Sequence, residues 1–226
     1  GSAAYRRAYR ALGAARQIED SAAALVTEGL DAVKLLRRTD GIIARELRGK
    51  GSGGGDDERF LGSLTCRGPV WRFDSVQTLC ARIYMLQDTY SLAFPMLQRI
   101  HTAASAKGFR AVVCPDPEHP DRIQHLLLPE LELAFVTSRE GMAYTGPAYR
   151  RVRLDAMVDA AHYKRFKARL RFSARVADAL REEGLEALRE AKAAHDQLEA
   201  VYHPHVDFNG VDQMVREELT RIESYL

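Results

Sequence analysis

Residues 82–114 read RIYMLQDTYSLAFPMLQRIHTAASAKGFRAVVC, and this stretch decides the fold. The apolar runs Arg82–Leu86 and Arg110–Cys114 have the length and composition of buried strands. Between them apolar residues return at helical spacing, with Pro95 in the first turn and Gly108 at the end. The pattern predicts a β-α-β unit with a right-handed crossover, and therefore an α/β protein.

Short apolar runs of the same kind continue over residues 59–153, which we expect to form one α/β domain. Further strands are predicted at Pro69–Phe73, His125–Leu128 and Leu131–Val136. Several of these runs lack strict alternation, which is typical of strands covered on both faces in a parallel or mixed sheet.

Helical patterns flank this domain on both sides. Residues 1–50 and 154–226 each predict a helical hairpin, and we expect the second to extend the sheet domain and to pack against the N-terminal helices. In the second hairpin Gly184 weakens the long helix by about 1 kcal/mol, and Pro204 breaks it because proline has no N–H to donate. Glycines followed by acidic residues predict a flexible linker over 51–58.

A weak internal repeat links the two helical regions. A shift of 176 positions aligns Leu12 with Leu188, Ala15 with Ala191 and Asp20 with Asp196. We therefore interpret residues 1–50 as the tail of a preceding, duplicated domain, with the two hairpins side by side about a pseudo-twofold axis. The same shift pairs Glu19 with His195, which suggests a buried charged pair; separate capping or exposed roles are the alternative.

The composition is that of an ordinary globular protein. Of 226 residues, 46% are hydrophobic and 28% are charged, which excludes disordered, collagen-like and disulfide-scaffold chains. Only three cysteines occur, which indicates a reducing, cytoplasmic setting. No signal peptide opens the chain and no apolar stretch approaches the ~20 residues that span a bilayer, so no membrane partner is expected.

The net charge of +2 hides two opposite blocks, +7 over residues 150–175 and −7 over 176–226. The basic block suits the phosphates of a nucleic acid, which would bind with steep salt dependence. Apolar residues within the block favour instead a packed helix whose arginines pair with the acidic helix that follows.

Three stretches resemble a family of duplicated P-loop-ATPase-like proteins of poorly defined function found mainly in Firmicutes. They are RFLGSLTCRGPVWRFDSV (59–76), GFRAVVCPDPEHPDRIQHLLLPELELAFVTS (108–138) and EAKAAHDQLEAVYHPHVDF (190–208). With the helices between them, the resemblance covers nearly the whole chain. It implies a P-loop-NTPase-like three-layer sheet domain that forms the second repeat, the first repeat as partner, and ATP with Mg²⁺ bound at a phosphate loop.

The chain departs from the family at the phosphate loop itself. GxxxxGK[ST] is needed there, but Gln87–Leu92 reads QDTYSL, without glycine or lysine. At 4 Å the carboxylate of Asp88 would repel a phosphate charge by roughly 4 kcal/mol at an effective dielectric near 20. Thr137-Ser138 also stands where a metal-binding aspartate is expected. We therefore predict a non-hydrolysing domain with a regulatory or interaction role, and no enzyme activity in this chain.

Two alternative functions stay open. One is a residual nucleotide-binding or ATPase domain that holds ATP and Mg²⁺ at Asp88, Thr89, Tyr90 and Ser91, with the turn 114–120 beside it. The other is a metal- or nucleic-acid-binding module.

A metal ion would be held by the imidazole and carboxylate groups of His195, His203, His205 and Asp207. Histidines that cap a helix end are the simpler interpretation.

A nucleophile-and-base arrangement is also considered for the turn that follows the third strand. Cys114, with His119 or His125, would supply these two groups. No third group that would orient the base is present, and proline-rich turns commonly redirect the chain.

Overall fold

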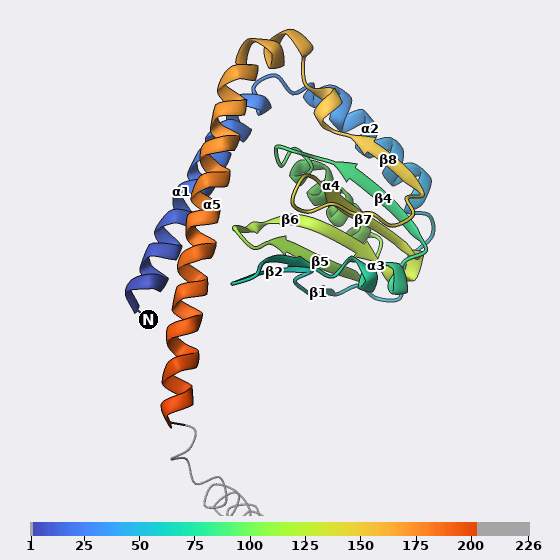
Figure 1. The fold of residues 1–226 in the computed structure, drawn as a ribbon. Coiled ribbons are helices and arrows are strands. Elements are labelled where there is room, and N and C mark those ends of the chain that lie inside the picture. Colours follow the sequence, from blue (N-terminus) through green and yellow to red (C-terminus); the bar gives the residue numbers. More distant parts are fainter. Residues whose placement is uncertain (1, 203–226) are drawn as a thin grey trace, which may run out of the picture.

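The computed structural model describes residues 2–202 (Figure 1). The helices are α1 (Ser2–Thr27), α2 (Ala32–Glu46), α3 (Phe73–Leu79), α4 (Phe94–Ala106) and α5 (Ala160–Tyr202), with short 3-10 turns η1 (Pro129–Leu131) and η2 (Asp155–Met157). The strands are β1 (Asp56–Glu58), β2 (Gly62–Thr65), β3 (Gly68–Trp71), β4 (Arg82–Gln87), β5 (Ala111–Asp116), β6 (His119–Leu128), β7 (Leu133–Ser138) and β8 (Arg150–Arg153).

Six strands form one mixed sheet in the order β1-β5-β6-β7-β4-β8. Strand β6 is antiparallel to β5 and to β7, and the other neighbours pair in parallel. The α/β class is thereby confirmed. β4 and β5 run in the same direction but are separated by β6 and β7, so α4 crosses over two strands rather than joining adjacent ones.

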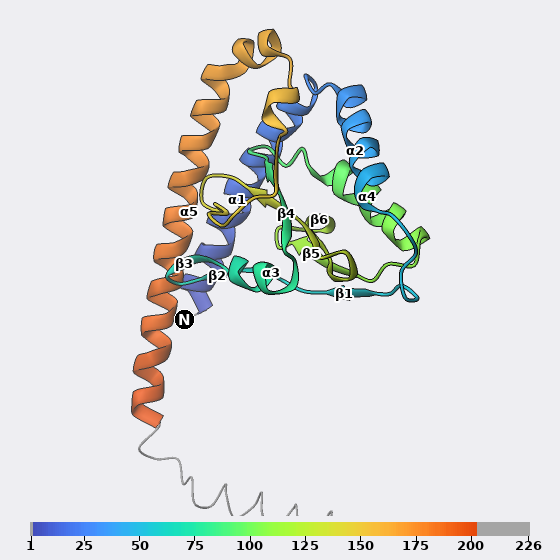
Figure 2. The same cartoon turned by 90° about the vertical axis from the view of Figure 1, so that its right-hand side faces the viewer.

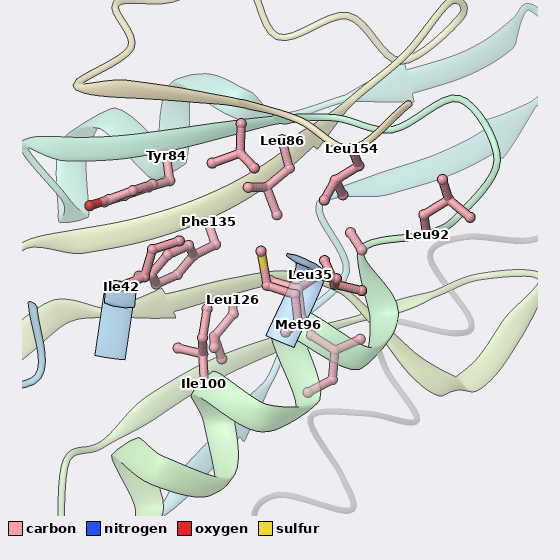
Figure 3. Close-up of a cluster of buried hydrophobic side chains, with 14 of the residues drawn as sticks. Leu35, Ile42, Tyr84, Leu86, Leu92, Met96, Ile100, Leu126, Phe135 and Leu154 are labelled. Atoms are coloured by element: carbon pink, nitrogen blue, oxygen red, sulfur yellow. The ribbon is translucent and has the colours of Figure 1, made fainter. Parts of the chain in front are cut away.

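One face of the sheet carries the larger hydrophobic core, beneath α2 and α4. Figure 3 shows side chains from both helices meeting those of the central strands, among them Leu35, Ile42, Met96, Ile100, Tyr84, Leu126 and Phe135. Tyr84 and Phe135 stack with their ring centroids 5.0 Å apart. Successive side chains of a strand point to opposite faces of the sheet, so every second one faces this core.

The opposite face has a smaller core and a thinner cover. Ile83, Met85, Cys114 and Val136 from the strands meet Val76 of α3 and Tyr144 of the loop before β8. The cover consists of the seven-residue helix α3 and loops, with the separate β2–β3 hairpin beside it. Of the predicted three layers, the helical layer of α2 and α4 is present on one face of the sheet, whereas the layer on the other face contains one short helix, α3.

A buried carboxylate ties the end of α2 to the sheet. Glu46 accepts a hydrogen bond from the Tyr84 hydroxyl at 2.5 Å and forms ion pairs with Arg45 and Arg82. Burial opposes ionisation of Glu46, but these donors outweigh it and lower its pKa. The network fixes α2 over β4 although neither arginine is itself deeply buried.

The helices α1 and α5 form an antiparallel arm beside the sheet domain (Figures 1 and 2). Buried alanines line their contact: Ala8, Ala11, Ala15, Ala177, Ala187 and Ala191. Gly184 lies where a Cβ atom would be 2.8 Å from Cγ of Leu12. Helix α5 continues through Gly184, whose missing side chain lets α1 approach closely.

The structure differs from the two predicted hairpins. Helix α1 joins α5, whereas α2 covers the sheet with α4. Of the hairpin predicted over 154–226, the described part is the single helix α5, and the predicted second helix lies outside the described residues.

The predicted linker over 51–58 also differs in its second half. Asp56–Glu58 form the edge strand β1 beside β5, and the Gly51 N–H donates to the Lys107 carbonyl at 2.9 Å. The segment is thus held by backbone hydrogen bonds along the sheet edge.

The close approach at Gly184 predicts a strong effect of added volume. We expect Gly184→Leu to lower the free energy of unfolding by about 1–3 kcal/mol, because the side chain must displace Leu12. Gly13→Leu is the matched control on α1, since its Cβ would meet nothing within 4 Å. Urea unfolding of both variants measures the difference; equal stabilities would contradict this account of the arm.

Candidate functional site

The carboxyl ends of β4, β7 and β8 meet at one edge of the sheet, because these three strands are parallel neighbours. In α/β sheets ligands bind outside this edge. Asp88 follows β4, Arg139 follows β7 and Asp155 follows β8. We therefore examine this edge as the candidate functional site.

The side chain of Asp88 binds backbone N–H groups just before α4. Its buried carboxylate, 3% exposed, accepts hydrogen bonds from the backbone N–H groups of Leu92 at 2.6 Å and Ala93 at 2.9 Å. Such free N–H groups at a helix N-terminus are the donors that bind phosphate in P-loop proteins. Burial raises the pKa of Asp88 to about 6, and the two amide bonds act in the opposite direction. The carboxylate therefore takes the place of an external anion.

The structure brings the other three residues of the predicted nucleotide site to the same edge, each with a partner within the chain. Thr89 donates its N–H to the carboxylate of Asp155 at 3.0 Å and its hydroxyl at 2.7 Å. The Tyr90 hydroxyl lies 3.4 Å from that of Tyr163.

Ser91, which has a left-handed φ of 57°, accepts a hydrogen bond from Nη1 of Arg139 at 3.1 Å. The Arg139 guanidinium, the cation at this edge, is thus engaged by a neighbouring hydroxyl.

Sequence reasoning missed Asp155 and Arg139. The strand β8, which precedes Asp155, reads RRVR, and so basic a sequence did not predict a strand there. Arg139 lies three positions past the predicted strand Leu131–Val136 and directly after the observed β7, so its nearness to the strand end was the available signal. At the same end Thr137 donates its hydroxyl to the Gln124 carbonyl at 3.1 Å, which makes Thr137 part of the sheet rather than a metal ligand.

The predicted nucleophile Cys114 and base His125 lie next to each other, but the thiol is not activated. Cys114 faces His125 across the β5–β6 pair, and both are buried. Burial raises the pKa of Cys114 to about 12 and lowers that of His125 to about 3, so the thiol and the neutral imidazole persist at pH 7. His119 lies apart and pairs with Asp20 of α1 at 2.9 Å. This arrangement provides no activated nucleophile.

His125 is held inside an aromatic cage. Its Nδ1 accepts a hydrogen bond from the Thr137 N–H at 3.1 Å, which places the ring proton on Nε2. Nε2 is buried and has no hydrogen-bond partner within residues 2–202. The rings of Trp71 and Phe73 stand nearly perpendicular to the imidazole, at 80° and 90°.

Of the predicted metal ligands, only His195 belongs to the described part of the chain; His203, His205 and Asp207 lie outside it. His195, Asp196 and Glu199 place one possible ligand atom each within 4.8 Å of one another. All three are exposed, Nδ1 of His195 lies 3.4 Å from Glu199, and Asp196 binds Lys192. This cluster has the contacts of a solvated helix face.

The predicted pair of Glu19 and His195 is wrong. Glu19 pairs with Arg181, which also binds Glu118 at 3.1 Å. His195 lies 14 positions beyond Arg181 on α5, about 21 Å along the helix.

In the part of the chain that the structure describes, the basic block does not fold back on the acidic block. Residues 176–202 of the acidic block belong to α5, and this continuous helix of 43 residues keeps them apart from the basic residues that precede them. Within residues 2–202, none of the nine Lys and Arg side chains of 150–175 forms an ion pair. The predicted pairing is therefore wrong for the part of the chain that the structure describes.

No described helix is both long enough and apolar enough to cross a membrane. Comparison of the chain with family models, with curated proteins and with solved structures finds no match.

The cage around His125 predicts acid sensitivity. The folded-state pKa near 3 lies below the ordinary 6.5, so the unfolded chain binds the extra proton and stability falls as the pH drops from about 6.5 toward 3. Asp88, whose pKa is raised, changes stability in the opposite direction over part of this range.

The variant His125→Asn isolates this contribution, because its amide oxygen can still accept from Thr137. Relative to this variant, the wild type should lose up to about 1.4 kcal/mol of unfolding free energy per pH unit between pH 6 and 4. Urea unfolding at several pH values measures the slopes. Parallel pH profiles would rule out a buried neutral imidazole.

Proposed function

We propose that this chain is a P-loop-ATPase-like domain that does not hydrolyse nucleotide and acts as an interaction domain. The observation that carries the proposal is the carboxylate of Asp88 on the N–H groups of Leu92 and Ala93. A triphosphate at this place would have to displace a buried anion and then lie beside Asp155.

The remaining groups at the edge support the same conclusion. Thr89 and Arg139 are the hydroxyl and the cation best placed for a phosphate, and both bind within the chain. The resemblance to P-loop-ATPase-like proteins agrees with a strand, turn and helix in which β4 has parallel neighbours on both sides. What the domain offers a partner is therefore its surface, and its nucleotide edge is closed.

Nucleotide binding is the decisive test. We expect no rise in melting temperature with 5 mM ATP or GTP in the presence of Mg²⁺. A nucleotide present at 100 times its Kd would instead raise the free energy of unfolding by about 2.7 kcal/mol, which the melting temperature would show. Asp88→Ala should lower the free energy of unfolding without nucleotide by about 1–2 kcal/mol, since it leaves the buried N–H groups of Leu92 and Ala93 without their acceptor.

The variant Thr78→Ala serves as control for handling, because its hydroxyl makes only a local 3.3 Å contact with the Asp74 carbonyl. A saturable stabilisation of the wild type by ATP would refute the proposal and favour the residual nucleotide-binding domain.

A second candidate function, nucleic-acid binding, rests on a basic groove between α2 and β8. The groove has a volume of about 490 Å³ and is lined by five exposed cationic side chains, Lys34, Arg37, Arg38, Arg151 and Arg153. No ion pair engages any of the five within residues 2–202, and the nearby Asp40 of α2 is bound to Arg99. Arginines of this kind suit the phosphates of a nucleic acid.

This second function predicts a defined salt dependence. If the five cations contact phosphates, the logarithm of the association constant for duplex DNA should fall with the logarithm of salt concentration with a slope of about −4.5. Arg37→Glu combined with Arg151→Glu should reduce this slope by about 2.

Arg6→Glu with Arg10→Glu, an equal charge change on exposed positions of α1, is the control. Fluorescence anisotropy between 50 and 200 mM salt measures the slopes, and equal losses in both double variants would exclude the groove.

A further inference from the structure

The middle of α5 carries an open apolar groove on the side that faces away from the rest of the chain. The groove has a volume of about 540 Å³ and is lined only by residues of α5: Phe172, Arg175, Val176, Ala179 and Leu180. In Figure 2, α1 and the sheet domain both lie to the right of this helix. Arg181, which binds Glu118 of the sheet domain, lies about half a turn around the helix from Ala179. Phe172 is accordingly 61% exposed.

The same face of α5 continues beyond the groove with opposite charges at its two ends. On a helix that coils around a partner, residues seven positions apart lie in line. One such line consists of Arg165, Phe172, Ala179 and Glu186, and a second, four positions later, of Arg169, Val176, Glu183 and Glu190. All the arginines and glutamates of these two lines are exposed. The face is therefore basic at one end, apolar in the middle and acidic at the other end.

These charges are poorly balanced by the rest of the chain. In the part that the structure describes, neither Arg165 nor Arg169 forms an ion pair. Arg7 of α1 binds Glu183 at 3.0 Å and Glu190 at 2.7 Å, while Glu186 makes no ion pair among residues 2–202. One guanidinium thus serves three carboxylates at the acidic end, and the basic end has no counterion.

We propose that α5 of a second copy of this chain binds this face in the antiparallel direction, about a twofold axis between Val176 and Ala179. In this register Val176 of each copy contacts Ala179 of the other. Two charge pairs follow from the same register, Arg169 with Glu186 and Arg165 with Glu190, and each occurs twice because the interface is symmetric.

The remaining pair of the register is also compatible with this packing. Phe172 comes opposite Glu183, whose carboxylate is held by Arg7 of its own chain. The aromatic ring therefore meets the methylene groups of Glu183 rather than its charge. Phe172 thereby loses its exposure to water, which is the main apolar gain of the interface.

A second copy is the partner that this charge pattern fits best. Along one continuous helix of 43 residues the basic end cannot return to the acidic end, but an antiparallel copy brings the two ends together. A parallel copy would place arginine against arginine and glutamate against glutamate. A nucleic acid would suit the basic end alone and would be repelled by the acidic end. The dimer concerns the arm only and goes beyond the proposed function, which rests on the carboxyl ends of the strands.

Sedimentation equilibrium of residues 1–226 tests the dimer. We expect a reversible association to twice the mass of one chain at micromolar concentrations. Arg169→Glu should raise the dissociation constant about tenfold or more, because the twofold axis creates two contacts between like charges. Glu186→Arg should have the same effect. Mixing the two variants should restore the dimer, since every contact between positions 169 and 186 then joins opposite charges.

Lys167→Glu is the matched control, because it makes the same charge change on an exposed residue about half a turn around the helix from Arg169. It should leave the dissociation constant unchanged, and all three variants should melt at the temperature of the wild type when diluted to monomers.

Three results would overturn the dimer: a wild type that stays monomeric up to millimolar concentration, equal weakening by Lys167→Glu and Arg169→Glu, or a mixture of variants that does not associate. Stabilisation by ATP would refute the proposed function alone and would leave the sedimentation result unchanged, so the two failures can be told apart.

Discussion

The bond between one buried carboxylate and the start of α4 governs the character of this protein. Asp88 accepts hydrogen bonds from the N–H groups of Leu92 and Ala93, just before α4. An anion placed here would have to displace this buried carboxylate. With Thr89 held by Asp155 and Arg139 engaged by Ser91, the polar groups at the carboxyl ends of β4, β7 and β8 bind one another.

A second set of contacts holds the arm to the sheet domain. The alanines and Gly184 bring α1 and α5 close together, and Arg181 connects the arm to the sheet domain by binding Glu19 and Glu118. The domain is thus held beside this pair of helices, while Lys192 and Asp196, further along α5, bind each other with about half of each side chain exposed.

The local pattern of the sequence was sufficient for β4, α4, β5 and β7, because each is an apolar run with clear ends. It was insufficient for β1 and β8, whose sequences DDE and RRVR contain few or no apolar residues and become strands only through pairing with β5 and β4. An amphipathic stripe on a helix shows which face is buried but not against what, so the separation of α1 from α2 was not predictable. The electrostatic objection to a phosphate at Asp88 was available from the sequence. The hydrogen bonds of its carboxylate to the chain just before α4 were not, because Leu92, the nearer of the two donors, lies four positions further along the chain.

The length of α5 explains why the basic block and residues 176–202 of the acidic block remain separate. A helix of 43 residues extends about 64 Å, and a straight helix cannot return its acidic half to its basic half. The acidic half instead binds Arg7 of α1 through Glu183 and Glu190, so its charge is used within the arm. The basic residues of α2 and β8 that line the groove are exposed and form no ion pair within residues 2–202. Opposite charges along one chain neutralise each other only where the backbone allows them to meet, and in this fold the long helix prevents it.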